Sequence, residues 1–156
     1  MAEVVLYMFQ PDAMDRKILE EMFIGEKRKV LLQRMMGEIQ GAVEMRTPRH
    51  YLIVGPRGIG KTHFITLLYH RIGEEVKDAV AVKLSEEEFS VYKVSDLLLR
   101  IIETGRQEKV DLRRFYEMSN DDVVAASLEE LKSMGPIIVL FLENLNQITG
   151  EQMDER

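Results

Sequence analysis

The alternation of apolar runs with amphipathic stretches along this chain predicts a mixed α/β fold. Three short apolar runs, at residues 50–54, 79–84 and 137–142, predict strands. Elsewhere apolar side chains recur at helical spacing, which predicts helices over residues 12–22, 26–45, 61–72 and 96–103. A looser pattern predicts a helix over residues 107–118. A last helix is predicted to begin at the capping residues 119–122 and to end at Gly135. Because helical segments connect the strands, we expect a three-layer α/β domain with a parallel sheet.

Several boundaries can be predicted from single residues. Gly73 is placed to end the helix over residues 61–72, Ser95 is a candidate N-cap, and Gly105 is a candidate helix end. The run at 137–142 is the most hydrophobic in the chain, and we expect it to be a buried central strand. Residues 4–9 form an apolar run that is either a short strand or an arm on the surface.

A glycine-rich segment between the first predicted strand and the helix that follows it fits the phosphate-binding P-loop pattern G-x-x-x-x-G-K-[ST]. Such a loop brings backbone N–H groups close to phosphate oxygens, and glycines remove the Cβ atoms that would block the approach. The following helix directs its free N–H groups and positive dipole end at the same phosphates. We expect the nucleotide to contact a continuous run of residues: Gly55, Pro56, Arg57, Gly58, Ile59, Gly60, Lys61, Thr62 and His63. Lys61 would reach the β and γ oxygens, and the Thr62 hydroxyl would ligate Mg²⁺.

An acidic residue at the end of a neighbouring hydrophobic strand would complete such a site, because it holds Mg²⁺ opposite the P-loop threonine. Glu143, directly after the run at 137–142, fits this metal-binding role. Asn144 then stands where many of these enzymes have a glutamate that activates the attacking water. An asparagine orients a water but cannot accept its proton, so general-base catalysis would be lost there. We therefore include Lys61, Glu143 and Asn144 as the catalytic candidates.

Composition narrows the class of protein without identifying it. Hydrophobic residues make up 46% of the 156 residues, which suffices for a core, and the formal net charge is −6. An acidic chain does not indicate a dedicated nucleic-acid surface. The absence of cysteine excludes disulfides and thiolate chemistry, and together with the lack of a signal-peptide pattern or membrane-spanning run it leads us to expect a cytoplasmic protein.

Three segments together resemble the AAA+ ATPases, in particular their origin-recognition and STAND-like branch. Residues 23–25 (Phe-Ile-Gly) and the charged helix after them resemble the start of that domain, residues 55–62 its Walker A motif, and residues 137–146 its Walker B segment. The resemblance implies an ATP- and Mg²⁺-dependent P-loop NTPase fold, with Phe23 and Ile24 near the adenine. A hydrophobic corner that packs the start of the helix explains this pair equally well.

The same resemblance implies that part of the family's domain lies outside this chain. A sensor strand, an arginine finger and a helical lid follow Walker B in that family, whereas this sequence ends at Arg156. We therefore expect a single truncated P-loop domain over residues 1–156, with an N-terminal arm and helices over 1–49 and a nucleotide-binding α/β core over 50–156. Such a piece would need self-association or the missing C-terminal portion.

Three functions remain open from the sequence. The first is an ATPase domain that binds Mg²⁺ and ATP and hydrolyses it slowly. The second is a nucleotide-dependent switch or interaction module without turnover, which Asn144 favours. The third is a P-loop kinase, although the sequence shows no arginine-rich lid or substrate-side pattern.

Overall fold

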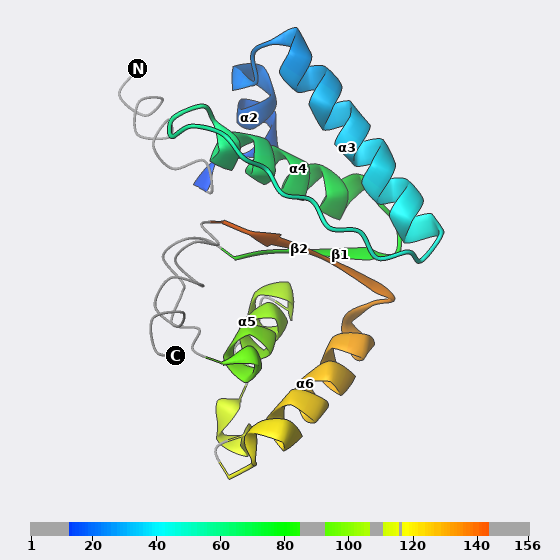
Figure 1. Cartoon of the computed structure of the whole chain (residues 1–156), viewed down its shortest axis with the longest axis vertical. Coiled ribbons are helices and arrows are strands. Elements are labelled where there is room, and N and C mark those ends of the chain that lie inside the picture. The colour runs from blue at the N-terminus through cyan, green and yellow to red at the C-terminus, as the bar shows by residue number, and fades with distance from the viewer. Residues whose placement is uncertain (1–12, 85–92, 107–110, 116, 144–156) are drawn as a thin grey trace. The chain divides into compact units, whose positions relative to one another are not determined.

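The computed structural model describes residues 13–84, 93–106, 111–115 and 117–143, and shows a mixed α/β chain (Figure 1). Its elements, in chain order, are α2 (Arg16–Met22), α3 (Glu26–Glu44), α4 (Lys61–Glu75), β1 (Ala79–Leu84), α5 (Val94–Arg106), the 3₁₀ helix η3 (Leu112–Phe115), α6 (Asn120–Met134) and β2 (Ile137–Leu142). The chain divides into two compact units, Met1–Ala79 and Val80–Arg156. None of the described helices is both long and apolar enough to cross a lipid bilayer.

In the first unit, helices α2 and α3 both pack on α4. Helix α3 buries apolar side chains at helical spacing, and so does α4; the buried side chains are Leu32, Met35, Met36, Ile39 and Val43 of α3 and Phe64, Leu67, Leu68 and Ile72 of α4. The chain turns between α2 and α3 at Gly25, whose φ of 107° is in a region that side-chain-bearing residues rarely adopt. Burial of these facing apolar stripes is the main source of stability in this unit.

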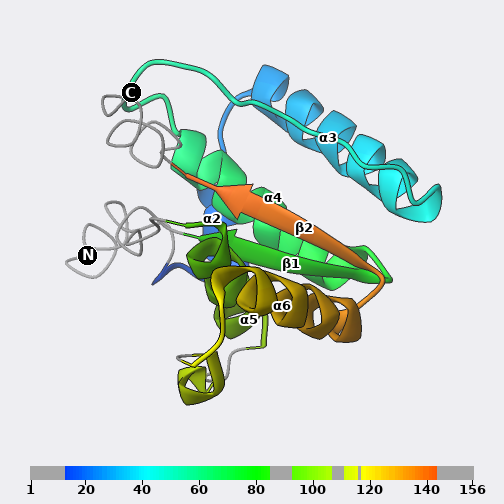
Figure 2. The same cartoon turned by 60° about the horizontal axis from the view of Figure 1, so that its bottom comes forward.

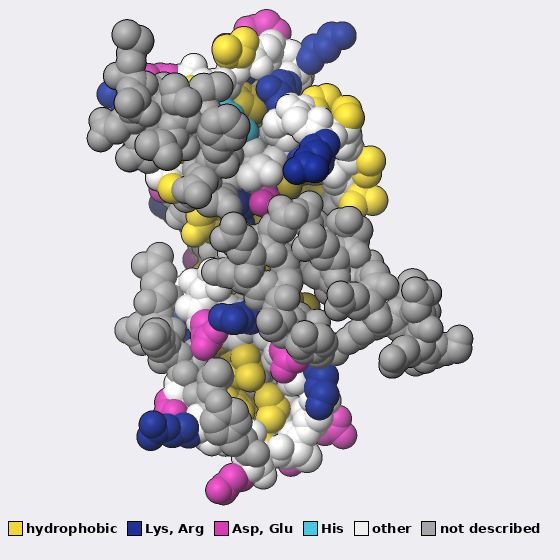
Figure 3. Space-filling view, turned by 90° about the vertical axis from the view of Figure 1, so that its left-hand side faces the viewer, with side chains coloured by type: hydrophobic (Ala, Val, Ile, Leu, Met, Phe, Trp, Pro, Cys, Tyr) yellow, Lys and Arg dark blue, Asp and Glu magenta, His cyan; other side chains and the backbone are white. Residues whose placement is uncertain are grey.

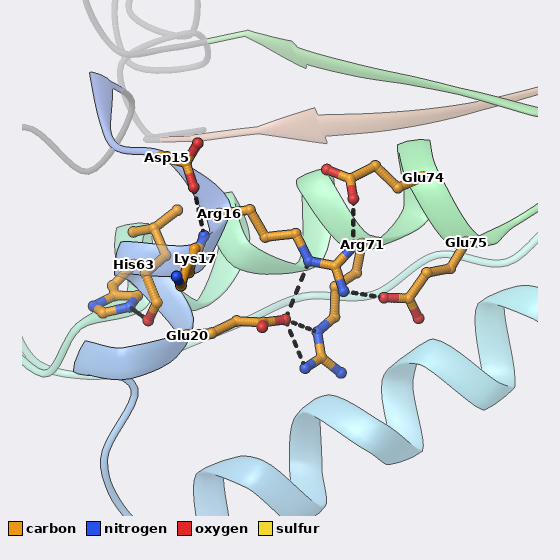
Figure 4. A network of polar contacts seen from close by, with 9 residues as sticks. Asp15, Arg16, Lys17, Glu20, His63, Arg71, Glu74 and Glu75 are labelled. Atoms are coloured by element: carbon orange, nitrogen blue, oxygen red, sulfur yellow. Dashed lines mark hydrogen bonds and ion pairs between the residues drawn. The ribbon is translucent and has the colours of Figure 1, made fainter.

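A network of charged side chains fastens α2 to the C-terminal half of α4 (Figure 4). Arg16 donates hydrogen bonds to Glu20, at 3.1 Å, and to Glu74 and Glu75 of α4. Arg71 of α4 donates to the same Glu20 oxygen from Nε, at 3.0 Å, and from Nη2, at 2.9 Å. Glu20 therefore accepts from both helices, and its carboxylate links them.

In the second unit, β1 and β2 form a two-stranded parallel sheet, with α5 and α6 on one of its faces (Figure 2). Even-numbered residues of both strands face these helices, as the alternation of side chains along a strand requires. The core consists of Val82, Leu84 and Ile101, with Val80, Leu97, Leu131, Ile138, Leu140 and Leu142 packed against them. Odd-numbered residues, among them Lys83 and Phe141, therefore lie on the opposite face.

Two predicted strands have the predicted bounds, and the third does not form. Residues 79–84 and 137–142 are strands, but residues 50–54 form none, and their side chains include the exposed Leu52 (79%) and Val54 (82%). A strand is defined by hydrogen bonds to a neighbour, and the described chain pairs β1 only with β2. The prediction of a buried central strand at 137–142 is also wrong, since β2 has one described neighbour and only Phe141 is buried along it.

The helix ends show where local signals were misleading. Helix α4 continues past Gly73 to Glu75, and α5 extends from Val94 through Gly105 to Arg106. Ser95 lies inside α5, and its hydroxyl donates to Asn120 Oδ1 at 2.8 Å instead of capping the helix. The N-cap predicted in residues 119–122 is confirmed, because Ser119 Oγ accepts from the Asp122 N–H at 3.2 Å. In the stretch 107–118, the described part shows only the 3₁₀ helix η3, and residues 4–9 lie outside the described residues.

On the face shown in Figure 3, both basic side chains (Lys, Arg) and acidic side chains (Asp, Glu) occur among the described residues.

Candidate nucleotide-binding site

The loop over residues 55–60 leads directly into α4. Its backbone turns through a hydrogen bond from the Ile59 N–H to the Pro56 carbonyl, 3.4 Å long. Gly58 and Gly60 have φ values of 81° and 91°, which residues with a Cβ rarely adopt. A Cβ on Gly55 would lie 3.2 Å from Ile59 Cγ2, a tight contact that would require the Ile59 side chain to shift. The glycines at these positions therefore permit both the left-handed backbone and the tight path of the loop.

Lys61 is the first residue of α4, and its side chain folds back over the loop. Its Nζ donates to the Gly55 carbonyl at 2.8 Å and to the Pro56 carbonyl at 3.0 Å. The ammonium group is thus held at the beginning of the loop, in the first unit, by acceptors that are neutral. An anionic ligand would be a stronger partner for this cation than the two carbonyl oxygens are.

The first turn of α4 presents backbone donors toward the same loop. The earliest backbone hydrogen bond of the helix runs from the Phe64 N–H to the Gly60 carbonyl, at 3.0 Å. The N–H groups of Lys61, Thr62 and His63 precede it, so α4 itself offers them no acceptor. These are the donors that, with the positive end of the helix dipole, bind anions in other proteins.

The imidazole of His63 is held by α2. Its Nε2–H donates to the Leu19 carbonyl at 2.8 Å, and its ring lies 5.6 Å from the ring of Phe23. Phe23 is buried and also packs 6.0 Å from Phe64, whereas Ile24 is 75% exposed. Phe23 therefore packs as a hydrophobic corner, which was one of its two interpretations from the sequence. The ring of His63 joins α2 to α4, while its backbone N–H lies at the start of α4 beside the loop.

Arg28 was not among the predicted site residues, and the structure places it on the loop. From the first turns of α3, its Nη2 donates to the Ile59 carbonyl, and its guanidinium lies 5.7 Å from the centre of the Phe23 ring. A Cβ on Gly60 would collide with the same guanidinium. The sequence signal was only the presence of an arginine shortly after Gly25, which does not specify its partner.

Glu143 lies in the second unit, directly after β2, where it was predicted. Its N–H donates to the Leu84 carbonyl at 3.5 Å, which continues the pairing of β2 with β1. Its carboxylate Oε1 lies 3.8 Å from Nζ of Lys83, and the two side chains are only 9% and 8% exposed. The strand-end acid is therefore buried beside a lysine of the neighbouring strand, a partner that the sequence analysis did not identify. Asn144 lies outside the described residues.

The predicted ligands of a metal ion, Thr62 and Glu143, both offer oxygen donors. Among the described residues, no three His, Cys, Asp or Glu side chains form a metal site by themselves. The Thr62 hydroxyl and the Glu143 carboxylate are of the oxygen type that Mg²⁺ prefers, and nucleotide-bound Mg²⁺ takes most of its ligands from phosphates and water. The assignment of Thr62 and Glu143 as Mg²⁺ ligands therefore stays a prediction from the sequence.

Comparisons of this chain with protein-family models, with curated proteins and with solved structures gave no match.

Proposed function

We propose that this chain is an ATP-binding domain with a P-loop NTPase fold of the AAA+ type. The main support is the loop over residues 55–60: two glycines with positive φ, a helix that begins at Lys61, and an ammonium group folded over the loop. This combination occurs in the segment where the sequence pattern independently predicts a phosphate site.

The phosphates would be bound by residues 55–63. The N–H groups at the start of α4 and the Lys61 ammonium are the donors, and Lys61 would exchange its two carbonyl partners for β- and γ-phosphate oxygens. Mg²⁺, when bound, would neutralise phosphate charge. Its protein ligands would be Thr62 and Glu143, and that assignment rests on the sequence pattern of the two residues.

The choice between slow hydrolysis and a switch without turnover depends on the residue at position 144. Asn144 lacks the basic group that would take a proton from the attacking water. Its presence favours the second candidate function, a module whose state depends on bound nucleotide. ATP binding is common to both candidates, and hydrolysis distinguishes them.

The test is a titration of the purified chain with a fluorescent ATP analogue, in wild type and in Lys61→Ala. Each hydrogen bond to a charged group is worth about 1.5–3 kcal/mol, so loss of the ammonium should weaken ATP binding by about 100-fold. The matched control is Lys77→Ala, which removes an exposed lysine just after α4 and should leave the affinity unchanged. If Lys61→Ala binds ATP as tightly as wild type does, the proposed site is wrong.

A steady-state ATPase assay on the same proteins separates the two candidates. Tight binding without turnover, with turnover gained in Asn144→Glu, supports the switch. Turnover by wild type that disappears in Lys61→Ala supports the slow ATPase.

A further inference from the structure

We propose that Arg28 is a positioning residue that orders the phosphate-binding loop before any ligand arrives. This inference rests on the proposed function, since it names how the same loop is prepared for phosphate. It concerns the peptide bond between Ile59 and Gly60, which lies immediately before α4.

The direction of that peptide follows from its hydrogen bond. The Ile59 carbonyl accepts from Arg28 Nη2, so its oxygen points toward α3. No peptide bond among the described residues is cis, and in a trans peptide the carbonyl oxygen and the next N–H point in opposite directions. The Gly60 N–H therefore points away from α3, in the orientation in which it can join the N–H groups at the start of α4.

Hydrogen bonds hold the Ile59 N–H and the Gly60 carbonyl on either side of this peptide, and the bond from Arg28 holds the carbonyl of the peptide itself. Ile59 is 51% exposed, and glycine at position 60 offers no side chain to anchor the backbone. Glycine has access to both signs of φ, so a peptide next to it reorients easily. A donor that is already fixed favours ligand affinity, because the loop then loses less conformational entropy when the ligand binds.

The position of Arg28 is itself well supported. Its guanidinium lies over the Phe23 ring, and Phe23 is buried against Phe64 of α4. This cation–π contact places the guanidinium beside the loop. The same guanidinium occupies the space that a Cβ on Gly60 would need. Glycine at position 60 therefore permits both the φ of 91° and the close approach of Arg28.

The first measurement needs no nucleotide. We would compare backbone ¹⁵N order parameters of Gly58 and Gly60 in wild type, Arg28→Met and Arg28→Lys. Methionine keeps an apolar stem over Phe23 but has no donor, whereas lysine keeps a charged donor. We expect the Gly60 order parameter to fall from about 0.85 to below about 0.6 in Arg28→Met, and Arg28→Lys to restore it.

The second measurement is the affinity for ATP and for inorganic tripolyphosphate. Loss of one oriented donor should weaken both ligands about tenfold in Arg28→Met, with recovery in Arg28→Lys. Lys29→Met is the matched control, because it removes a charge from the same turn of α3. The Lys29 side chain is exposed, and its ammonium lies 3.5 Å from the carboxylate of Glu26. Thermal unfolding of each variant verifies that the fold is retained.

Each outcome decides a different statement. An unchanged Gly60 order parameter in Arg28→Met overturns the inference, whatever the ligand affinities are. A lower order parameter with unchanged affinity also overturns it, because the loop would then not need prior ordering. If wild type binds neither ligand, the proposed function fails, and the order parameters alone decide whether Arg28 orients this peptide.

Discussion

The buried pair Lys83–Glu143 provides a quantitative test of the second unit. Both side chains are less than 10% exposed, at 8% and 9%, and Nζ lies 3.8 Å from Oε1. The perturbation is replacement of each residue by methionine, singly and together. Methionine has a comparable length and no charge, so each single change leaves one buried charge without this partner.

The expected magnitude follows from burial and distance. Removing one partner of a buried ion pair typically costs about 3–5 kcal/mol, whereas replacing both by apolar residues is often close to neutral. The separation of 3.8 Å exceeds the usual length of a charge-assisted hydrogen bond, so we expect the low end, about 3 kcal/mol, for each single variant. The double variant should lie within about 1 kcal/mol of wild type, which gives a coupling energy of at least about 2 kcal/mol.

The assay is urea unfolding followed by circular dichroism, with hydrogen exchange of β1 and β2 amides to assign the effect to the second unit. Lys132→Met is the control, because its pair with Glu129 has side chains that are 72% and 73% exposed. Such an exposed pair contributes at most about 0.5 kcal/mol. Additive single effects, each below about 1 kcal/mol, would show that the pair is not buried in solution and would refute this reasoning.

Two further predictions concern stability. Burial raises the pKa of Glu20, but hydrogen bonds from Arg16 and Arg71 outweigh it and leave the pKa below its usual value. The carboxylate therefore stabilises the fold at pH values above its unfolded pKa of about 4.3. In thermal unfolding, the stability difference between wild type and Glu20→Gln should shrink as the pH falls below about 4. A stability difference that does not change with pH would contradict this prediction. Gly105→Ala should destabilise by about 1–3 kcal/mol, since its Cβ would meet Met134 and lie 3.0 Å from Val82 Cγ2. Gly41→Ala, with nothing within 4 Å, should instead stabilise by about 1 kcal/mol, and equal effects in the two variants would contradict the packing.

Local signals predicted those parts of the fold that depend on neighbours in sequence. The Ser119 cap was identified because its partner, Asp122, is three residues away along the chain, and that bond forms. Ser95 has the same chemistry, but its hydroxyl bonds Asn120, 25 residues away, which no local pattern indicates. Tertiary partners thus decide which of two equally good capping residues acts as a cap.

The strand predicted at residues 50–54 failed for a related reason. Its residues have the apolar composition of a strand, yet Leu52 and Val54 are exposed, and no strand of the described chain pairs with them. Composition indicates that a segment tolerates extended backbone, whereas pairing depends on a second segment. The helix start at Lys61 was predicted correctly because the motif itself contains the glycines that set it.

The same distinction applies to the candidate site. The spacing of the motif identified residues 55–62 and the acid after β2, because both features are continuous in sequence. It could not identify Arg28 or Lys83, since each acts on a residue of another element, Ile59 and Glu143 respectively. Lys83 matters most for the proposed chemistry: a carboxylate beside a buried ammonium has part of its charge compensated and is a weaker ligand for a cation than an unpaired one. The metal-binding capacity of a strand-end acid therefore depends on the residue beside it on the neighbouring strand. Here Lys83 weakens the attraction of the Glu143 carboxylate for a metal ion.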